Sequence, residues 1–220
     1  MWDIEQFLKG RMARVKVLVF GACLIPIARL GLGAYTDALG ANPIEFITHS
    51  TGIWTLVFLL LTLAITPLRR ITGLNELVKL RRMLGLFAFC YACLHLTTYV
   101  VLDQFFDAAT IIEDIVKRPY ITAGFAGFLL MVPLAATSSR KMINRLGRRW
   151  QRLHRLVYIS ATAGVVHFLW LVKADLREPI IYAGILAVLL GYRLFRVFDR
   201  ERLLNINWPE FRRKKLRAES

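Results

Sequence analysis

Four histidines lie inside or beside long apolar stretches, which is a costly setting for a titratable side chain. His154 and His167 stand near the two ends of RLHRLVYISATAGVVHFL, His95 lies in LFAFCYACLHLTTY, and His49 precedes another apolar run. A histidine inside a membrane is usually retained by a partner or a function. Two neutral imidazoles that face each other can fill both axial positions of a haem iron, which favours electron transfer over oxygen chemistry. A hydrogen bond between helices is the structural alternative for any one of them.

The elements that must position these histidines are long uncharged runs in a chain that is 56% hydrophobic. A bilayer core about 30 Å thick takes roughly 20 apolar helical residues to cross. Six stretches approach that length, and Arg29 interrupts the first of them. The sequence therefore predicts an all-α integral membrane protein, a six-transmembrane-helix bundle with spans at 15–33, 50–67, 83–102, 120–137, 155–172 and 179–197. The first span also resembles a secretory signal, but no A-x-A cleavage site follows before Arg29, which favours a retained helix.

The distribution of basic residues predicts the orientation of the bundle and argues against nucleic acid as the reason for a net charge of +15. Of the 30 Lys and Arg, 25 fall in the N-terminal arm, the second and fourth connections and the tail, and four fall in the connections between them. This is the positive-inside pattern, with both termini cytoplasmic. It divides the chain into a cytoplasmic arm at 1–14, the helical domain at 15–198 and a basic tail at 199–220. The tail is predicted to bind anionic lipid headgroups, with docking of a partner as the alternative.

With this orientation, the depth of each histidine follows from counting. His95 lies 13 residues beyond Arg82, and His167 lies 13 residues beyond His154 at the cytoplasmic mouth. Thirteen helical residues correspond to a rise of about 20 Å from the cytoplasmic side. His95 and His167 are therefore predicted at one depth toward the outer face. His49 heads its span nearer still to the external interface. Thirteen residues at about 100° each leave His154 and His167 about 140° apart on an ideal helix, so a distortion near Gly164 or a separate site for His154 is required.

Other chemistries find less support in the sequence. Cys23, Cys90 and Cys93 all fall inside spans, where thiols usually behave as small apolar side chains. Copper or zinc bound by His and Cys is an alternative to haem, although no carboxylate lies at histidine depth. A small transporter with histidines as proton relays and a structural membrane scaffold are the other two alternatives. There is no Walker or G-x-G-x-x-G loop, and hence no predicted nucleotide-binding domain.

Several arginines are candidates for binding a cofactor or a partner. Arg29 either reaches to the headgroups or pairs with a haem propionate or a partner carboxylate. Arg82, Arg152 and Arg155 on the inner face act as orientation charges or contact a propionate, a flavin phosphate or a quinone. The external segment DQFFDAATIIEDIVKRP has an apolar face at near-helical spacing and four carboxylates. It is predicted to be a helix lying on the membrane, with a docking surface as the alternative.

A set of motifs over roughly residues 12–198 resembles the MsrQ (formerly YedZ) family, within the ferric-reductase-like transmembrane group. The matching stretches are NPIEFITHSTG, ITPLRR, RRMLGLFAFCYACLHLTTY, KRPYITAGF, LGRRWQRLHRLVYI and HFLWLVK. The resemblance implies a haem-binding subunit, a b-type cytochrome of the bacterial inner membrane. It would take electrons from the quinol pool or a cytosolic flavin reductase. Its implied acceptor is a periplasmic molybdenum-containing methionine-sulfoxide reductase, which repairs oxidised methionine.

The same resemblance implies roles for individual residues. His95, His154 and His167 fall on the family's haem histidines, and His49 on its THxTG-like position. Larger two-haem proteins of this fold carry histidine pairs on the third and fifth helices, whereas the inner position of the third helix is Arg82 here. The resemblance therefore implies one haem b between His95 and His167, and allows a second near His154. It also implies bound FMN, for which the sequence contains no motif.

Overall fold

The computed structural model describes residues 2–172 and 175–218, and side chains within 12–172 and 175–198. These residues form helices and connections, and no strand occurs among them. The long helices are α1 (Trp2–Tyr35), α2 (Pro43–Thr72), α3 (Val78–Thr97), α5 (Pro119–Ala136), α8 (Leu156–Leu171) and α9 (Arg177–Ala218). Shorter elements connect them: the 3₁₀ helix η1 (Asn75–Leu77), the π-helix η2 (Thr98–Asp103), α4 (Ala108–Lys117), α6 (Arg140–Leu146) and α7 (Arg148–Leu153).

Five helical stretches are long and apolar enough to cross a membrane. They are Met12–Tyr35, Pro43–Thr72, Asn75–Asp103, Pro119–Ala136 and Arg177–Phe198. The predicted all-α integral membrane fold is thereby confirmed. The predicted fifth span corresponds to α8, which has 16 residues and a length of about 24 Å. A sixth crossing therefore stays a prediction, as does the cytoplasmic placement of the termini.

The ends of α2 and α4 are specified by local sequence signals. Asn42 caps α2, with its side-chain oxygen accepting from the backbone N–H of Glu45 at 3.3 Å, and Pro43 occupies the first turn. Gly73 ends α2 with a φ of 71°, a conformation that glycine adopts without strain. Asp107 caps α4 by accepting from Ala109 and Thr110, and these bonds lower the pKa of its carboxyl group. The amphipathic helix predicted in the external segment is therefore present as α4.

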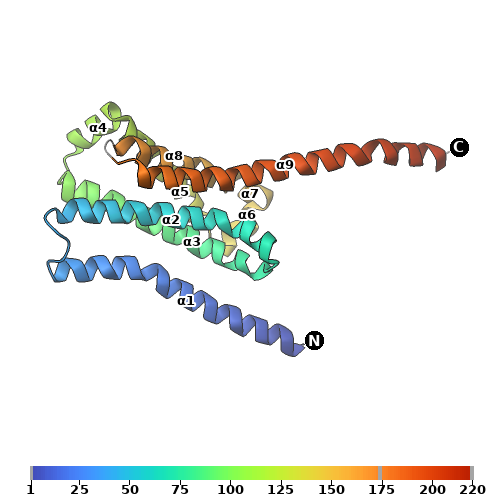
Figure 1. Ribbon diagram of the computed structural model, residues 1–220, viewed down its shortest axis with the longest axis horizontal. Coiled ribbons are helices and arrows are strands. Elements are labelled where there is room, and N and C mark those ends of the chain that lie inside the picture. The colour runs from blue at the N-terminus through green and yellow to red at the C-terminus, as the bar shows by residue number, and fades with distance from the viewer. Residues whose placement is uncertain (1, 173–174, 219–220) are drawn as a thin grey trace.

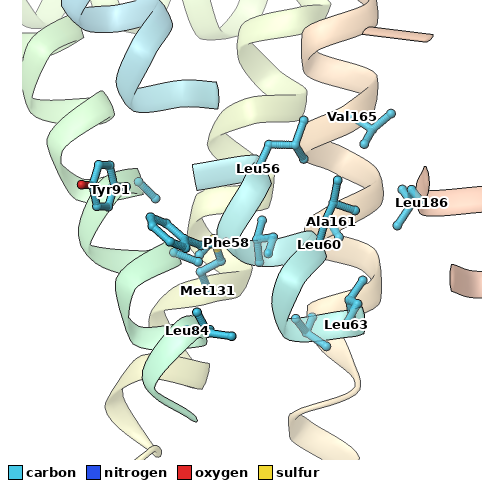
Figure 2. Packing of buried hydrophobic residues seen from close by; sticks show 14 of the residues in the cluster. Leu56, Phe58, Leu60, Leu63, Leu84, Tyr91, Met131, Ala161, Val165 and Leu186 are labelled. Carbon is cyan, nitrogen blue, oxygen red and sulfur yellow. The ribbon is translucent and has the colours of Figure 1, made fainter. Parts of the chain in front are cut away.

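Both chain termini lie toward the same end of the bundle, so we call this the terminal end and the opposite one the distal end (Figure 1). α2 and α3 form one antiparallel pair, α5 and α8 form another, and α9 runs along α8 and α2 (Figure 1). The core lies between these pairs. Figure 2 shows Leu56, Phe58 and Leu60 of α2 facing Met131 of α5 and Ala161 of α8.

Small residues bring α5 and α8 into close contact. A Cβ on Gly127 would lie 3.3 Å from the Cβ of Ala163, and the Ser160 hydroxyl donates to the carbonyl of Gly127 at 2.9 Å. Ala161, on the same helix, is completely buried. Packing through small residues is the usual way in which membrane helices approach closely. The α5–α8 pair thus forms a rigid support for the residues near its distal end.

α1 lies at the edge of the bundle, and a tyrosine of α3 bonds to its backbone. Pro26 cannot donate a backbone hydrogen bond, which weakens the helix around it. The hydroxyl of Tyr91 on α3 accepts from the backbone N–H of Ile27 at 3.1 Å and donates to the carbonyl of Cys23 at 2.9 Å. Tyr91 is only 1% exposed. It bonds to both backbone groups that a helical bond would ordinarily join, the N–H of Ile27 and the carbonyl of Cys23, and so fastens α1 to α3.

Candidate functional site

Two of the four histidines face each other near the distal end of the bundle. His95 lies in the last turn of α3, and His167 lies near the end of α8. Their ring centroids are 6.2 Å apart, and the ring planes make an angle of 78°. The two residues are 72 positions apart in the chain, and the antiparallel helix pairs bring them together. The site therefore consists of a histidine pair between two rigid helices.

The hydrogen bonds of the pair determine which ring nitrogen is available. Nδ1 of His95 lies 2.8 Å from the carbonyl oxygen of Thr48, and Nδ1 of His167 lies 2.6 Å from that of Tyr120. A carbonyl oxygen only accepts, so both Nδ1 atoms carry the proton and donate. In a neutral ring, Nε2 then keeps its lone pair. A histidine that donates one ring N–H to a backbone carbonyl has the arrangement of a metal ligand, because that bond fixes its tautomer and orientation.

The spacing of the two rings fits one metal centre held between them. Two collinear metal–nitrogen bonds of about 2 Å each would place the ring centroids roughly 6 Å apart. Among the described residues, no group of three or more His, Cys, Asp and Glu gathers at one point. Structural zinc sites use four such ligands and catalytic ones three. A pair of histidines instead suits a metal whose remaining ligands come from a macrocycle, as in haem.

Glycines make room for both rings. A Cβ on Gly52 of α2 would lie 3.1 Å from Cε1 of His95. A Cβ on Gly124 of α5 would lie 2.7 Å from Nδ1 of His167 and 3.0 Å from its Cε1. The contact of 2.7 Å between the Gly124 Cβ position and Nδ1 of His167 is shorter than real Cβ atoms tolerate. This nitrogen is also the one that donates to the Tyr120 carbonyl. The ring of His167 thus occupies space that only glycine leaves free.

We therefore expect Gly124→Ala to displace the ring of His167 and to weaken binding of any metal group held there. Overpacking of this kind costs about 1–3 kcal/mol, and disturbing the support of a metal ligand typically lowers affinity about 10–100-fold. The measurement is the haem content per protein after purification and titration with added haem. Gly184→Ala in α9 is the matched control, because nothing lies within 4 Å of its Cβ position. Equal haem affinity in the two variants would contradict the expectation.

His95 is followed directly by an uncommon element. The π-helix η2 begins three residues later at Thr98 and continues α3 to Asp103. π-helical turns are rare and occur frequently at functional sites. Phe105 and Phe106 follow in a turn with φ values of 48° and 63°, which is a strained conformation for bulky residues. The chain therefore leaves the histidine site through a sharply constrained segment that leads into α4.

His49 lies on α2 at the distal end but outside the histidine pair. Its side chain is exposed, and its ring packs edge-on against Phe168 at a centroid distance of 6.0 Å. It lines a cavity of about 240 Å³ together with Phe168, Val172, Asp175, Glu178 and Pro179. The structure thus places His49 against Phe168, the residue that follows His167. Within the described part of the chain, no other histidine faces His49.

His154 lies at the terminal end, in the turn between α7 and α8. Its ring stacks on Trp150 at 3.9 Å, and its Nδ1 donates to the Trp150 carbonyl at 3.2 Å. Its Nε2 is buried and has no hydrogen-bond partner among the described residues. Burial lowers the pKa of His154, and the positive charge of Arg81 lowers it further. Both effects favour the neutral imidazole, which is the form that binds metals.

Two arginines, Arg81 and Arg155, line a cavity together with His154. The sequence predicted Arg82 at this place, and not Arg81. A cavity of about 190 Å³ is lined by Arg81, Trp150, Gln151, His154, Arg155 and Tyr158. Arg155 was predicted to belong to such a site, whereas Arg82, Arg152 and Arg29 are exposed and line neither cavity. Helix phase explains the difference at α3, because Arg81 lies about 40° around the helix from His95 and Arg82 about 140°.

Arg193 of α9 is a second arginine near this cavity that the sequence did not single out. Its guanidinium lies 4.4 Å from the ring centroid of Tyr158 and donates to the Thr66 hydroxyl at 3.0 Å. Arg81 and Arg193 are both half-buried and close enough to repel each other. Within the described side chains, neither forms a salt bridge with a carboxylate. The terminal end therefore has an excess of partly buried positive charge.

Comparison with known proteins agrees with this architecture. Residues 51–165 match the family described as ferric reductase like transmembrane component. The chain is 55% identical over 193 residues to a protein of Herminiimonas arsenicoxydans, covering 86% of this chain and 88% of that one. A protein of Azospira oryzae is 54% identical over 201 residues (90% and 84%), and one of Rhodospirillum rubrum is 53% identical over 196 residues (89% and 94%).

Each of these three relatives is named the heme-binding subunit MsrQ of protein-methionine-sulfoxide reductase. The identity extends over nearly the whole of each relative, so the match is not confined to a few motifs. The resemblance seen in the sequence is thereby confirmed. The chain belongs to the MsrQ family of integral membrane proteins, within the ferric-reductase-like transmembrane components.

Proposed function

We propose that this chain is the haem-binding, electron-transferring membrane subunit of a methionine-sulfoxide reductase system. The observation that carries the proposal is the pair His95 and His167, with centroids 6.2 Å apart and both Nδ1 atoms bonded to backbone carbonyls. The names of the relatives support haem as the group and the reductase as the partner. When bound, the haem supplies one-electron chemistry. The protein supplies two axial nitrogens, their orientation and an apolar surrounding.

The residues of the pair determine what kind of redox chemistry the site supports. Nε2 of His95 and Nε2 of His167 would hold the haem iron from two sides of the site, and a haem held by two histidines would supply electron transfer and not oxygen chemistry. The bonds to the carbonyls of Thr48 and Tyr120 keep each histidine in the tautomer that carries its proton on Nδ1. Gly52 and Gly124 let the rings approach without strain. Such a site passes electrons and does not itself reduce a sulfoxide, so the oxidised methionine is reduced by the partner.

The direction of transfer in this proposal follows from the placement of charge. The terminal end, with its basic connections and the tail at 199–220, would face the cytoplasm of a bacterial inner membrane, where the tail binds anionic lipid. α8 would form the sixth crossing of the 15–198 helical domain, and residues 1–14 the cytoplasmic arm. The distal end would face the periplasm and a molybdenum-containing reductase. Electrons would then enter beside His154 and leave beside His95.

The terminal-end cavity is the proposed entry site. His154 offers a neutral Nε2, and Arg81 and Arg193 offer positive charge that propionates or a phosphate would neutralise. Two groups with acidic substituents fit, a second haem b with a non-histidine ligand and FMN. A quinone in exchange with the pool is the third candidate, with its carbonyl oxygens as acceptors for the arginines. Arg155 also lines the cavity. A cytosolic flavin reductase or the quinol pool would be the donor.

The experiment is the absorption spectrum of the purified full-length protein, before and after reduction. A Soret band with split reduced bands is expected from a bis-histidine b-type cytochrome. A proton-coupled transporter or a structural scaffold would show neither, and a colourless protein that cannot be loaded with haem would overturn the proposal. Addition of the purified reductase and an oxidised methionine substrate should then reoxidise the reduced protein. Failure of that step alone would refute the assigned partner.

A further inference from the structure

A buried carboxylate at the distal end has no part in the site described above. Asp114 of α4 is 5% exposed, whereas its neighbour Glu113 is exposed and pairs with Lys117. A buried carboxylate costs free energy unless its oxygens are paired and hydrogen-bonded. Both oxygens of Asp114 are used: Oδ2 accepts from the Tyr99 hydroxyl at 2.9 Å, and Oδ1 lies 3.1 Å from Nε of Arg118. Asp114 is therefore a fixed junction between two segments.

These two segments carry the two histidines of the site. Tyr99 belongs to η2, which continues α3 directly beyond His95. Arg118 caps α5 and stands two residues before Tyr120, whose carbonyl accepts from Nδ1 of His167 at 2.6 Å. Asp114 thus joins the helix of one histidine to the backbone that orients the other.

The start of α5 is held against α4 at further points. The Arg118 N–H donates to the carbonyl of Asp114 at 2.9 Å, and the Thr122 hydroxyl donates to the carbonyl of Ile115. These bonds therefore tie α4 and the first turn of α5 into one unit. The bond between Tyr99 and Asp114 connects this unit to η2. Movement of the unit relative to η2 would shift the Tyr120 carbonyl relative to His95.

We propose that Asp114 is a positioning residue that sets the relative orientation of His95 and His167, acting through Tyr99 on one side and Arg118 on the other. This inference rests on the proposed function, because it treats the two histidines as ligands of one haem. Hydrogen bonding of a ligand histidine to a carbonyl raises the basicity of the ligand. A basic ligand stabilises ferric iron over ferrous iron. Loosening the Tyr120 carbonyl should therefore raise the midpoint potential of the haem.

The test compares Asp114→Asn with Glu113→Gln in the full-length haem-loaded protein. The two variants remove the same charge at neighbouring positions of α4, one buried and bridging, the other exposed. For Asp114→Asn we expect altered g-values in the ferric electron paramagnetic resonance spectrum, and an upward shift in midpoint potential at least twice that of Glu113→Gln. Equal shifts in the two variants, or unchanged g-values in Asp114→Asn, would overturn the inference.

Tyr99→Phe provides a milder variant, since it removes one hydroxyl and leaves the charges in place. It should alter the g-values in the same sense as Asp114→Asn, and it keeps the test decisive if Asp114→Asn fails to fold. Asp114→Glu should restore part of the wild-type signal, because the carboxylate is retained. A wild-type protein without a bis-histidine signal would refute the proposed function itself. A wild-type bis-histidine signal that Tyr99→Phe leaves unchanged would refute only the positioning role.

Discussion

Replacing His167 with alanine is expected to abolish binding of the haem proposed between His95 and His167, and replacing His95 is expected to give the same result. The two rings face each other at a centroid distance of 6.2 Å, so each would supply one axial ligand to the same iron. Disturbing the support of a metal ligand already lowers affinity about 10–100-fold, and loss of the ligand itself should exceed that range. The haem content per protein and the reduced bis-histidine bands are the quantities to measure.

The controls for this experiment lie on the same two helices. Thr97 follows His95 by two residues and is exposed, and Thr162 of α8 is exposed and bonds only to the carbonyl of its own helix residue Tyr158. Thr97→Ala and Thr162→Ala should insert equally well and keep the full spectrum. If either histidine variant retains wild-type haem with unchanged bands, the two rings do not share an iron.

The pairing of these histidines was accessible to sequence reasoning because depth in a membrane is a matter of counting. Basic residues mark where each helix begins, and a fixed rise per residue then places His95 and His167 at one level. The structure brings the two rings into direct opposition, and the all-α membrane fold around them is confirmed. What counting does not provide is the rotation of each helix, and so the faces that meet.

Helix rotation explains why Arg81 was not singled out beside Arg82. Fourteen residues at about 100° return almost to the starting face, so Arg81 shares the face of His95 and lines the cavity. Counting back from His95 at about 100° per residue would have identified Arg81 as the arginine on the same helix face. Arg193 had no comparable signal, because its place depends on how α9 packs against Tyr158 and Thr66. Such contacts between distant segments are tertiary and leave no local pattern in the sequence.

The break before α8 is a second feature that local sequence signals do not show. On one ideal helix, as the apolar run predicts, His154 and His167 would lie about 140° apart. In the structure, α7 ends at Leu153 and α8 begins at Leu156, so His154 lies in a turn between the two helices and not on α8. Neither Gly nor Pro occurs at this point, and the stacking on Trp150 stabilises the turn instead. His154 accordingly lies in the terminal-end cavity, apart from His95 and His167, and a separate site for it stays a prediction.

His154→Ala is therefore expected to slow reduction of the protein by its donor. The spectrum of the haem proposed between His95 and His167 should stay largely intact. Electrons that enter at the terminal end must cross a core about 30 Å thick, and a haem at the distal end leaves most of that distance unbridged. A redox group in the terminal-end cavity would bridge it, and its one neutral nitrogen ligand would be Nε2 of His154. We expect a decrease of at least about tenfold, equivalent to roughly 1.4 kcal/mol in activation free energy.

The measurement is stopped-flow reduction with a quinol and, separately, with a flavin reductase. The variants are compared at equal occupancy of the haem proposed between His95 and His167. Arg149→Ala is the matched control, because Arg149 is an exposed cation of α7 and does not line the cavity. Slowing in both variants would mean that substitutions anywhere in this segment impair reduction by the donor and that His154 has no specific part. Slowing with only one donor would identify which of the two uses this entrance. An unchanged rate in His154→Ala with both donors would refute a part for His154 in electron entry.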